Sequence, residues 1–159
     1  MEKIASFTVN HLTLMPGVYV SRQDNVNGNI ITTFDIRITR PNKEPVINTA
    51  EMHAMEHLGA TYLRNDREWK DKCIYFGPMG CRTGFYLILA GDLRPMDIID
   101  LLKSMFKWMK DYEGEIPGQS PRDCGNYLDL NLPMAKFVAE KYYTEVLLNI
   151  TEDRMIYPE

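Results

Sequence analysis

Apolar and polar residues alternate along residues 29–39, which is the repeat of a β-strand. The apolar positions are Phe34, Ile36 and Ile38, and the polar positions between them are Thr33, Asp35, Arg37 and Thr39. A period of two places the two sets on opposite faces of a sheet, so we expect Arg37 to face away from the core as an exposed strand residue. Residues 83–90 contain the apolar run Phe85-Tyr-Leu-Ile-Leu and predict a second strand.

Three other segments show the spacing of helices. The first begins at residue 48 or 49 and runs to about residue 65, with Glu51 placed to complete a capping box. The second opens with Pro95 and repeats apolar residues at helical spacing, from Ile98 to Met109. The third follows Pro133 and places on one side Phe137, Val138, Tyr142, Val146 and Leu147. Strands and helices grouped in blocks predict an α+β fold, an antiparallel sheet with helices packed on one face.

Length, composition and charge narrow the class of protein. The 159 residues and an apolar content of 45% suit one domain over residues 1–159 with a hydrophobic core. A net charge of -4 offers no basic face for nucleic acid or for an anionic membrane, and we expect neither partner. The sequence shows neither a secretion signal nor a long apolar run, so we expect a cytoplasmic protein with reduced cysteines.

Two of the three histidines fall in the run His53-Ala-Met-Glu56-His57, inside the first expected helix. Residues three and four apart share a helix face, so both imidazoles and the carboxylate point the same way. Two neutral imidazoles can chelate one divalent ion, and the carboxylate beside them can act as a base. The spelling His-x-x-Glu-His is that of the inverted zincins. A solvated helix face is the alternative, but such a face would more naturally carry Lys and Glu.

A metal site needs a third ligand from elsewhere in the chain. Cys124 is the best candidate, because a thiolate binds zinc or ferrous iron well and Gly125 permits close backbone approach. Taken alone, a loop cysteine is more often a small buried residue.

A second cysteine lies in a glycine-rich turn, Gly77-Pro-Met-Gly-Cys-Arg-Thr-Gly84. The glycines leave the Cys81 thiol accessible, and Arg82 beside it can favour the thiolate, as in an acid/base or nucleophilic cysteine. A packed turn cysteine is the alternative. Cys73 has no such surroundings and is expected to be inert. Local context assigns no role to Ser6, His11 or Arg37.

Four motifs follow one another along the chain: Phe34-Asp-Ile-Arg37 with Arg40-Pro-Asn-Lys43, His53-x-x-Glu56-His57-Leu58, Pro78-Met-Gly-Cys-x-Thr-Gly84 and Cys124-Gly125. In this order and at these separations they resemble the S-ribosylhomocysteine lyase (LuxS) family over nearly the whole chain. The resemblance implies an α+β fold, a homodimer with active sites at the subunit interface, and one divalent ion per subunit, Fe²⁺ or Zn²⁺. Tyr75 stands where that family often carries an acidic residue, so we assign no acidic role there.

The resemblance also implies a role for each candidate residue. His53, His57 and Cys124 would bind the metal, Glu56 and Cys81 would move protons, and the substrate would be held by Ser6, His11 and Arg37. The implied reaction splits the thioether of S-ribosylhomocysteine into homocysteine and dihydroxypentanedione, the precursor of a quorum-sensing autoinducer, by carbonyl migration and β-elimination.

Two other interpretations of the metal motif remain open at this point. A metal-dependent hydrolase of the inverted-zincin type would use Glu56 to activate water and would not need Cys81. A noncatalytic binding module would use the metal only to stabilise its fold.

Overall fold

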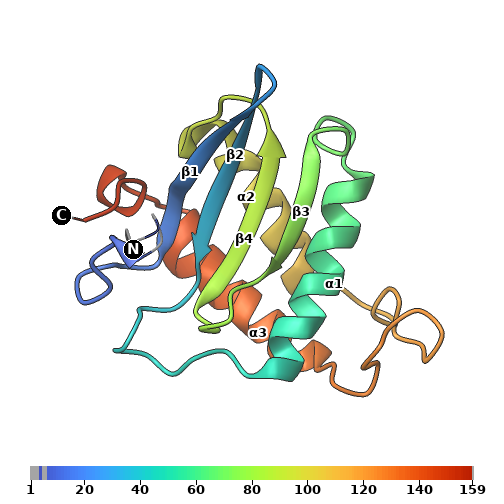
Figure 1. The fold of residues 1–159 in the computed structure, drawn as a ribbon. Helices are drawn as coiled ribbons and strands as arrows, with labels where there is room; N and C mark the ends of the chain where they lie inside the picture. The colour runs from blue at the N-terminus through green and yellow to red at the C-terminus, as the bar shows by residue number, and fades with distance from the viewer. Residues whose placement is uncertain (1–3, 5–6, 159) are drawn as a thin grey trace.

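Four antiparallel strands carry three helices on one face of a sheet in the computed structural model, which describes residue 4 and residues 7–158 (Figure 1). The sheet order is β1-β2-β4-β3. The strands are β1 (Gly17–Val26), β2 (Asn29–Arg37), β3 (Cys73–Pro78) and β4 (Gly84–Ala90). The helices are α1 (Thr49–Asn65), α2 (Pro95–Lys110) and α3 (Leu132–Tyr142), followed by a π-helix at Tyr143–Leu147 and a 3-10 turn at Glu152–Arg154. The expected α+β class is confirmed.

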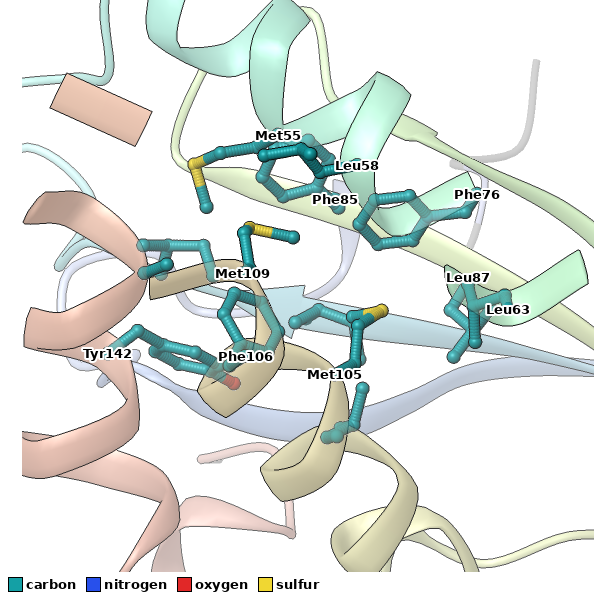
Figure 2. Close-up of a cluster of buried hydrophobic side chains, with 14 of the residues drawn as sticks. Met55, Leu58, Leu63, Phe76, Phe85, Leu87, Met105, Phe106, Met109 and Tyr142 are labelled. Carbon is teal, nitrogen blue, oxygen red and sulfur yellow. The ribbon is translucent and has the colours of Figure 1, made fainter. Parts of the chain in front are cut away.

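The hydrophobic core lies between the sheet and the helices, and Figure 2 shows side chains of both meeting there. Leu58 of α1, Leu87 of β4 and Phe106 of α2 are completely buried. Tyr142 joins them from α3, with its ring centroid 4.8 Å from that of Phe106. Among the described residues, no helix combines the length and the hydropathy needed to cross a membrane.

α1 packs tightly on β3 at Gly59. A Cβ atom added to Gly59 of α1 would lie 2.3 Å from Cε1 of Phe76, so a larger residue there would displace the helix or the ring. Phe76 in turn stacks on Phe85 of β4, with ring centroids 4.9 Å apart. Gly59 therefore sets the distance between α1, which carries the His-x-x-Glu-His motif, and the sheet.

Two strands, β1 and β3, were not predicted from the sequence. β1 and β2 form a hairpin whose turn residues Asn27 and Gly28 both have positive φ, 52° and 86°. An Asn-Gly pair between strands is a strong hairpin signal, but it was not used to predict β1. β3 is a short edge strand with Ile74 and Tyr75 exposed, so it lacks a clear alternation of buried and exposed positions.

The expectation that Arg37 is exposed is wrong. Its side chain does face away from the helices, since Phe34 and Ile36 of the same strand lie in the core. However, Arg37 is only 4% exposed. Phe7, Val9 and other residues from both ends of the chain cover this part of the sheet and line a cavity with Arg37. The period of two gave the correct face, but it carries no information about a second covering layer.

Two details of the helices also differ from expectation. Asn48 makes no side-chain capping bond at the start of α1; instead its Nδ2 donates to Glu51 Oε1 at 3.1 Å, so the predicted capping box is absent. Phe137 of α3 is 60% exposed, while Ala135 and Ala139 are completely buried. The buried face of α3 is thus marked by small residues that let helices approach closely, and the expected face was wrong at Phe137.

Candidate functional site

Three side chains expected to bind a metal converge in the structure. His53 and His57 lie one helical turn apart on α1, and Cys124 comes from the loop between α2 and α3. Their ligand atoms all lie within 4.8 Å of one another. His57 Nε2 is 3.1 Å from His53 Nε2, and Cys124 Sγ is 3.4 Å from His53 Nε2. These residues could therefore hold one ion.

Backbone carbonyls fix the orientation of both imidazoles. His53 Nδ1 is 2.9 Å from the carbonyl oxygen of Asp129, and His57 Nδ1 is 2.7 Å from that of Pro117. Because a carbonyl can only accept, each Nδ1 donates its proton, and a neutral ring then presents Nε2 as a free ligand. Sequence reasoning missed these two partners, since any residue can supply a carbonyl.

The loop that supplies these groups is itself held against α1. Asn131 N donates to the Ala50 carbonyl at 3.0 Å. Gly118 has a φ of +77°, and a Cβ there would lie 3.3 Å from His57 Nδ1. A glycine at this position therefore permits both the turn and the close contact with the imidazole.

The arrangement of donor atoms fits a divalent ion. With protons on both Nδ1 atoms, the two Nε2 lone pairs face each other at 3.1 Å and cannot bond to one another. A tetrahedral ion with ligands at about 2.0–2.3 Å would place its ligands roughly 3.3–3.6 Å apart, close to the distances of 3.1 and 3.4 Å that separate His53 Nε2 from the other two ligand atoms. Two imidazoles and a thiolate suit zinc or ferrous iron, and three protein ligands leave a coordination position for a substrate or water.

The ligand atoms open onto a cavity of about 530 Å³. Glu56, on the same face of α1, also lines this cavity and is half-buried. Phe76 and Gly125 contribute further walls. A carboxylate that lines the same cavity as the ligand atoms is suited to act as a general base on a molecule bound there.

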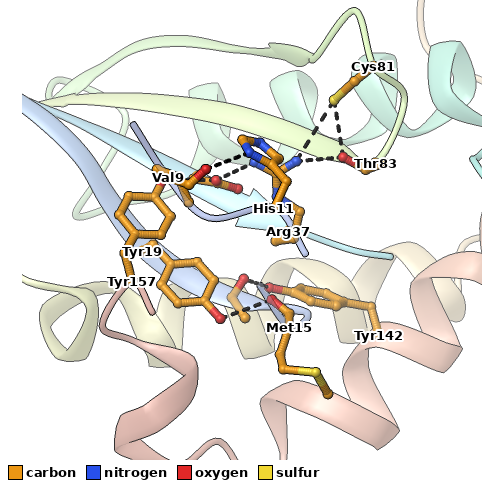
Figure 3. Close-up of polar contacts among 11 residues, drawn as sticks. Val9, His11, Met15, Tyr19, Arg37, Cys81, Thr83, Tyr142 and Tyr157 are labelled. Atoms are coloured by element: carbon orange, nitrogen blue, oxygen red, sulfur yellow. Dashed lines mark hydrogen bonds and ion pairs between the residues drawn. The ribbon is translucent and has the colours of Figure 1, made fainter. Parts of the chain in front are cut away.

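Cys81 lies in a different place, a cavity of about 230 Å³ that it shares with His11 and Arg37 (Figure 3). Its thiol is exposed, as expected, and Sγ is 3.1 Å from Thr83 Oγ1 and 3.8 Å from Arg37 Nη1. The cation beside the sulfur is thus Arg37, where the sequence had suggested its neighbour Arg82.

The structure therefore divides the predicted site residues into two groups, which line separate cavities that share no residue. Ser6 lies outside the described residues. Cys73 is buried, and burial raises the pKa of its thiol, which agrees with the expectation of an inert cysteine.

A buried ion pair supports the Cys81 cavity. Arg37 Nη2 donates to Asp35 Oδ2 at 2.5 Å, and its Nη1 donates to Thr83 Oγ1 at 2.5 Å. Burial acts to lower the pKa of Arg37, but the charge of Asp35 and its hydrogen bond offset this, and the pKa is raised. Asp35 could have been found from the sequence, since residues two apart on a strand share a face.

The metal site predicts a thermal shift that depends on Cys124. Adding Zn²⁺ or Fe²⁺ to chelator-treated protein should raise the melting temperature, with about 2.7 kcal/mol of stabilisation at 100 times the dissociation constant. The substitution Cys124→Ala should abolish most of this shift, whereas Cys81→Ala should retain it. Equal shifts for the two variants in differential scanning calorimetry would contradict the proposed ligand set.

Known proteins match this sequence over almost the full chain. The sequence profile described as S-Ribosylhomocysteinase (LuxS) matches residues 4–153. A protein named S-ribosylhomocysteine lyase from Clostridium beijerinckii is 64% identical over 158 residues, which cover 99% of each chain. Proteins of the same name from Clostridium acetobutylicum and Finegoldia magna are 64% and 62% identical and cover 100% of each chain. The chain therefore belongs to the S-ribosylhomocysteinase (LuxS) family.

Proposed function

We propose that this protein is a metal-dependent lyase that cleaves the thioether of S-ribosylhomocysteine to homocysteine and dihydroxypentanedione. The observation that carries the proposal is the cluster of His53, His57 and Cys124 beside Glu56, in a chain whose relatives bear the name of this enzyme. The donor set supports one divalent ion per subunit. We propose Fe²⁺, with Zn²⁺ as the substitute, because both accept imidazole and thiolate ligands.

The reaction moves a carbonyl along the sugar and then breaks the carbon–sulfur bond. When bound, the ion would act as a Lewis acid that polarises the sugar oxygens. Glu56 would take the proton from the carbon next to the carbonyl, and a proton would be returned to the former carbonyl carbon. Two such shifts bring the carbonyl into position for the last step, in which loss of the neighbouring proton expels homocysteine thiolate. Water is not consumed in this sequence.

Cys81 is proposed as the second acid/base group, acting on a different face of the sugar from Glu56. His11 and Arg37, which line the same cavity as Cys81, and Ser6 are proposed to hold the substrate. Arg37 is suited to this role because its guanidinium is fixed by Asp35 and Thr83. A cytoplasmic location and a role in supplying an autoinducer precursor belong to the same proposal.

Hydrolysis at the metal is the less favoured alternative. It would need only the metal ligands and Glu56, and it would assign no role to the cavity of His11, Arg37 and Cys81. Membership of the family also favours the lyase over an inverted-zincin hydrolase.

A homodimer with active sites at its interface would unite the two cavities. Each described chain has a metal half, on α1 and the following loop, and a Cys81 half, on the sheet. The sheet face that the helices leave open bears a further cavity of about 300 Å³ lined by Tyr75, Tyr86, Ile88 and their neighbours. This exposed apolar surface is suited to pairing with a second copy, as in isologous dimers. We propose that each metal half works with the Cys81 half of its partner.

The assignment of Cys81 can be tested by removing its thiol. In Cys81→Ala, kcat for release of homocysteine from S-ribosylhomocysteine should fall by roughly 10²–10⁴-fold, the range for a lost acid/base group. Metal content should stay at the wild-type level, because Cys81 is not a ligand. A thiol-reactive dye follows the release, and undiminished turnover would remove Cys81 from the mechanism.

The shared site can be tested by mixing two inactive variants. Cys81→Ala and Cys124→Ala, unfolded and refolded together in equal amounts, should recover about a quarter of wild-type activity, because about half of the dimers are mixed and each mixed dimer has one complete site. A mixture of His53→Ala and Cys124→Ala, which damage the same half, should remain inactive. Absence of recovery in the first mixture would show that both halves come from one chain.

A further inference from the structure

The C-terminal segment returns to the sheet and reaches the Cys81 cavity. In Figure 1 the C-terminal end lies on the β1 side of the sheet. Arg154 Nη1 donates to the Pro16 carbonyl at 3.4 Å, which ties the segment to the start of β1. Tyr157 then stacks on Tyr19, with ring centroids 4.8 Å apart and ring planes 9° from parallel. This packing makes Tyr157 part of the wall of the cavity that contains His11 and Cys81.

The hydroxyl of Tyr157 contacts the carboxylate that holds Arg37. Tyr157 donates to Asp35 Oδ2 at 2.8 Å, and the same oxygen accepts from Arg37 Nη2 at 2.5 Å. Asp35 is 1% exposed, so water cannot readily replace a lost donor. One buried carboxylate oxygen thus accepts from two donors, Arg37 of β2 and Tyr157 of the C-terminal segment.

Because Asp35 Oδ2 holds Nη2 of Arg37, its position also determines where Nη1 of the same guanidinium points. The guanidinium is planar and rigid, so a bond at Nη2 sets the position of Nη1. In this structure Nη1 donates to Thr83 Oγ1 and lies 3.8 Å from Cys81 Sγ. Figure 3 shows Arg37 reaching Cys81 and Thr83, with the rings of Tyr157 and Tyr19 side by side in the same region. A continuous set of contacts therefore leads from the tail to the thiol.

We propose that Tyr157 is a positioning residue of the active site, whose hydroxyl holds Asp35 so that Arg37 presents its guanidinium to the substrate beside Cys81. The inference rests on the proposed lyase function and on the substrate-binding role of Arg37. The ring of Tyr157 packs on Tyr19, whereas its hydroxyl contacts the carboxylate of Asp35. Burial and the charge of Asp35 raise the pKa of Tyr157, which keeps this hydroxyl protonated and able to donate.

The substitution Tyr157→Phe removes the hydroxyl and keeps the ring. Because Arg37 is proposed to contact the substrate both before and during the reaction, the KM for S-ribosylhomocysteine should rise roughly ten-fold while kcat changes less than about two-fold. Tyr142→Phe is a matched control. It removes a tyrosine hydroxyl that donates to the Gly17 carbonyl at the same distance, 2.8 Å, but lies outside the cavity. This control should lower the melting temperature and leave KM unchanged.

A second readout does not depend on activity. Arg37 Nε is buried, so its N–H resonance in protein labelled with ¹⁵N-arginine should be protected from exchange with water, and Arg37→Lys assigns it. Tyr157→Phe should increase this exchange roughly ten-fold, and Tyr142→Phe should not.

The possible outcomes separate the two proposals. A wild-type protein that releases no homocysteine would reject the lyase function, while the exchange measurement would still test the contact between Tyr157, Asp35 and Arg37. An active wild-type protein whose KM and Arg37 exchange are unaltered by Tyr157→Phe would overturn the positioning role alone. The same conclusion would follow if Tyr157→Phe and Tyr142→Phe had equal effects, because both would then be purely structural.

Discussion

The distance between α1 and the sheet controls the metal half of the site. Gly59 meets the ring of Phe76, and no larger side chain fits at the crossing. The same helix buries Met55 and Leu58 in the core. Because a helix has only one rotation that satisfies both contacts, the face carrying His53, Glu56 and His57 must turn toward the loop after α2. Core packing thus determines which side of the helix can bind a metal.

The loop between α2 and α3 completes the candidate metal half of the site. It supplies one candidate ligand, Cys124, and two carbonyls, from Pro117 and Asp129, which orient the imidazoles. Such a loop would gain order from an ion bound there, because loop conformation is coupled to metal binding. The Cys81 half is organised differently. There a buried ion pair, Asp35 with Arg37, is held by the sheet and by the C-terminal tail.

The parts of this arrangement that follow local rules could be predicted from the sequence. The spacing of His53 and His57 requires only a helix, and the alternation around Arg37 requires only a strand. The choice of Cys124 as a third ligand rested on thiolate chemistry, and the structure places it beside His53. The burial of Arg37 and the carbonyl partners of the histidines depend on segments distant in sequence. No local pattern records them.

The separation of Cys81 from the metal ligands has the same origin. The motifs that contain them succeed one another along the chain, but the sheet carries Cys81 while α1 and its loop carry the ligands. Sequence order therefore indicated one site, whereas the candidate residues of the described chain line two separate cavities. The proposed dimer, in which a second subunit completes each site, would reconcile the two observations.

The central claim is that the thioether is broken by elimination, and the sugar product tests it most directly. Elimination yields a molecule with two adjacent carbonyls, which an aromatic 1,2-diamine traps as a stable ring that mass spectrometry can quantify. Metal-loaded protein incubated with S-ribosylhomocysteine should give one trapped diketone for each homocysteine released. Release of homocysteine together with ribose, and without the diketone, would mean hydrolysis and would contradict the account.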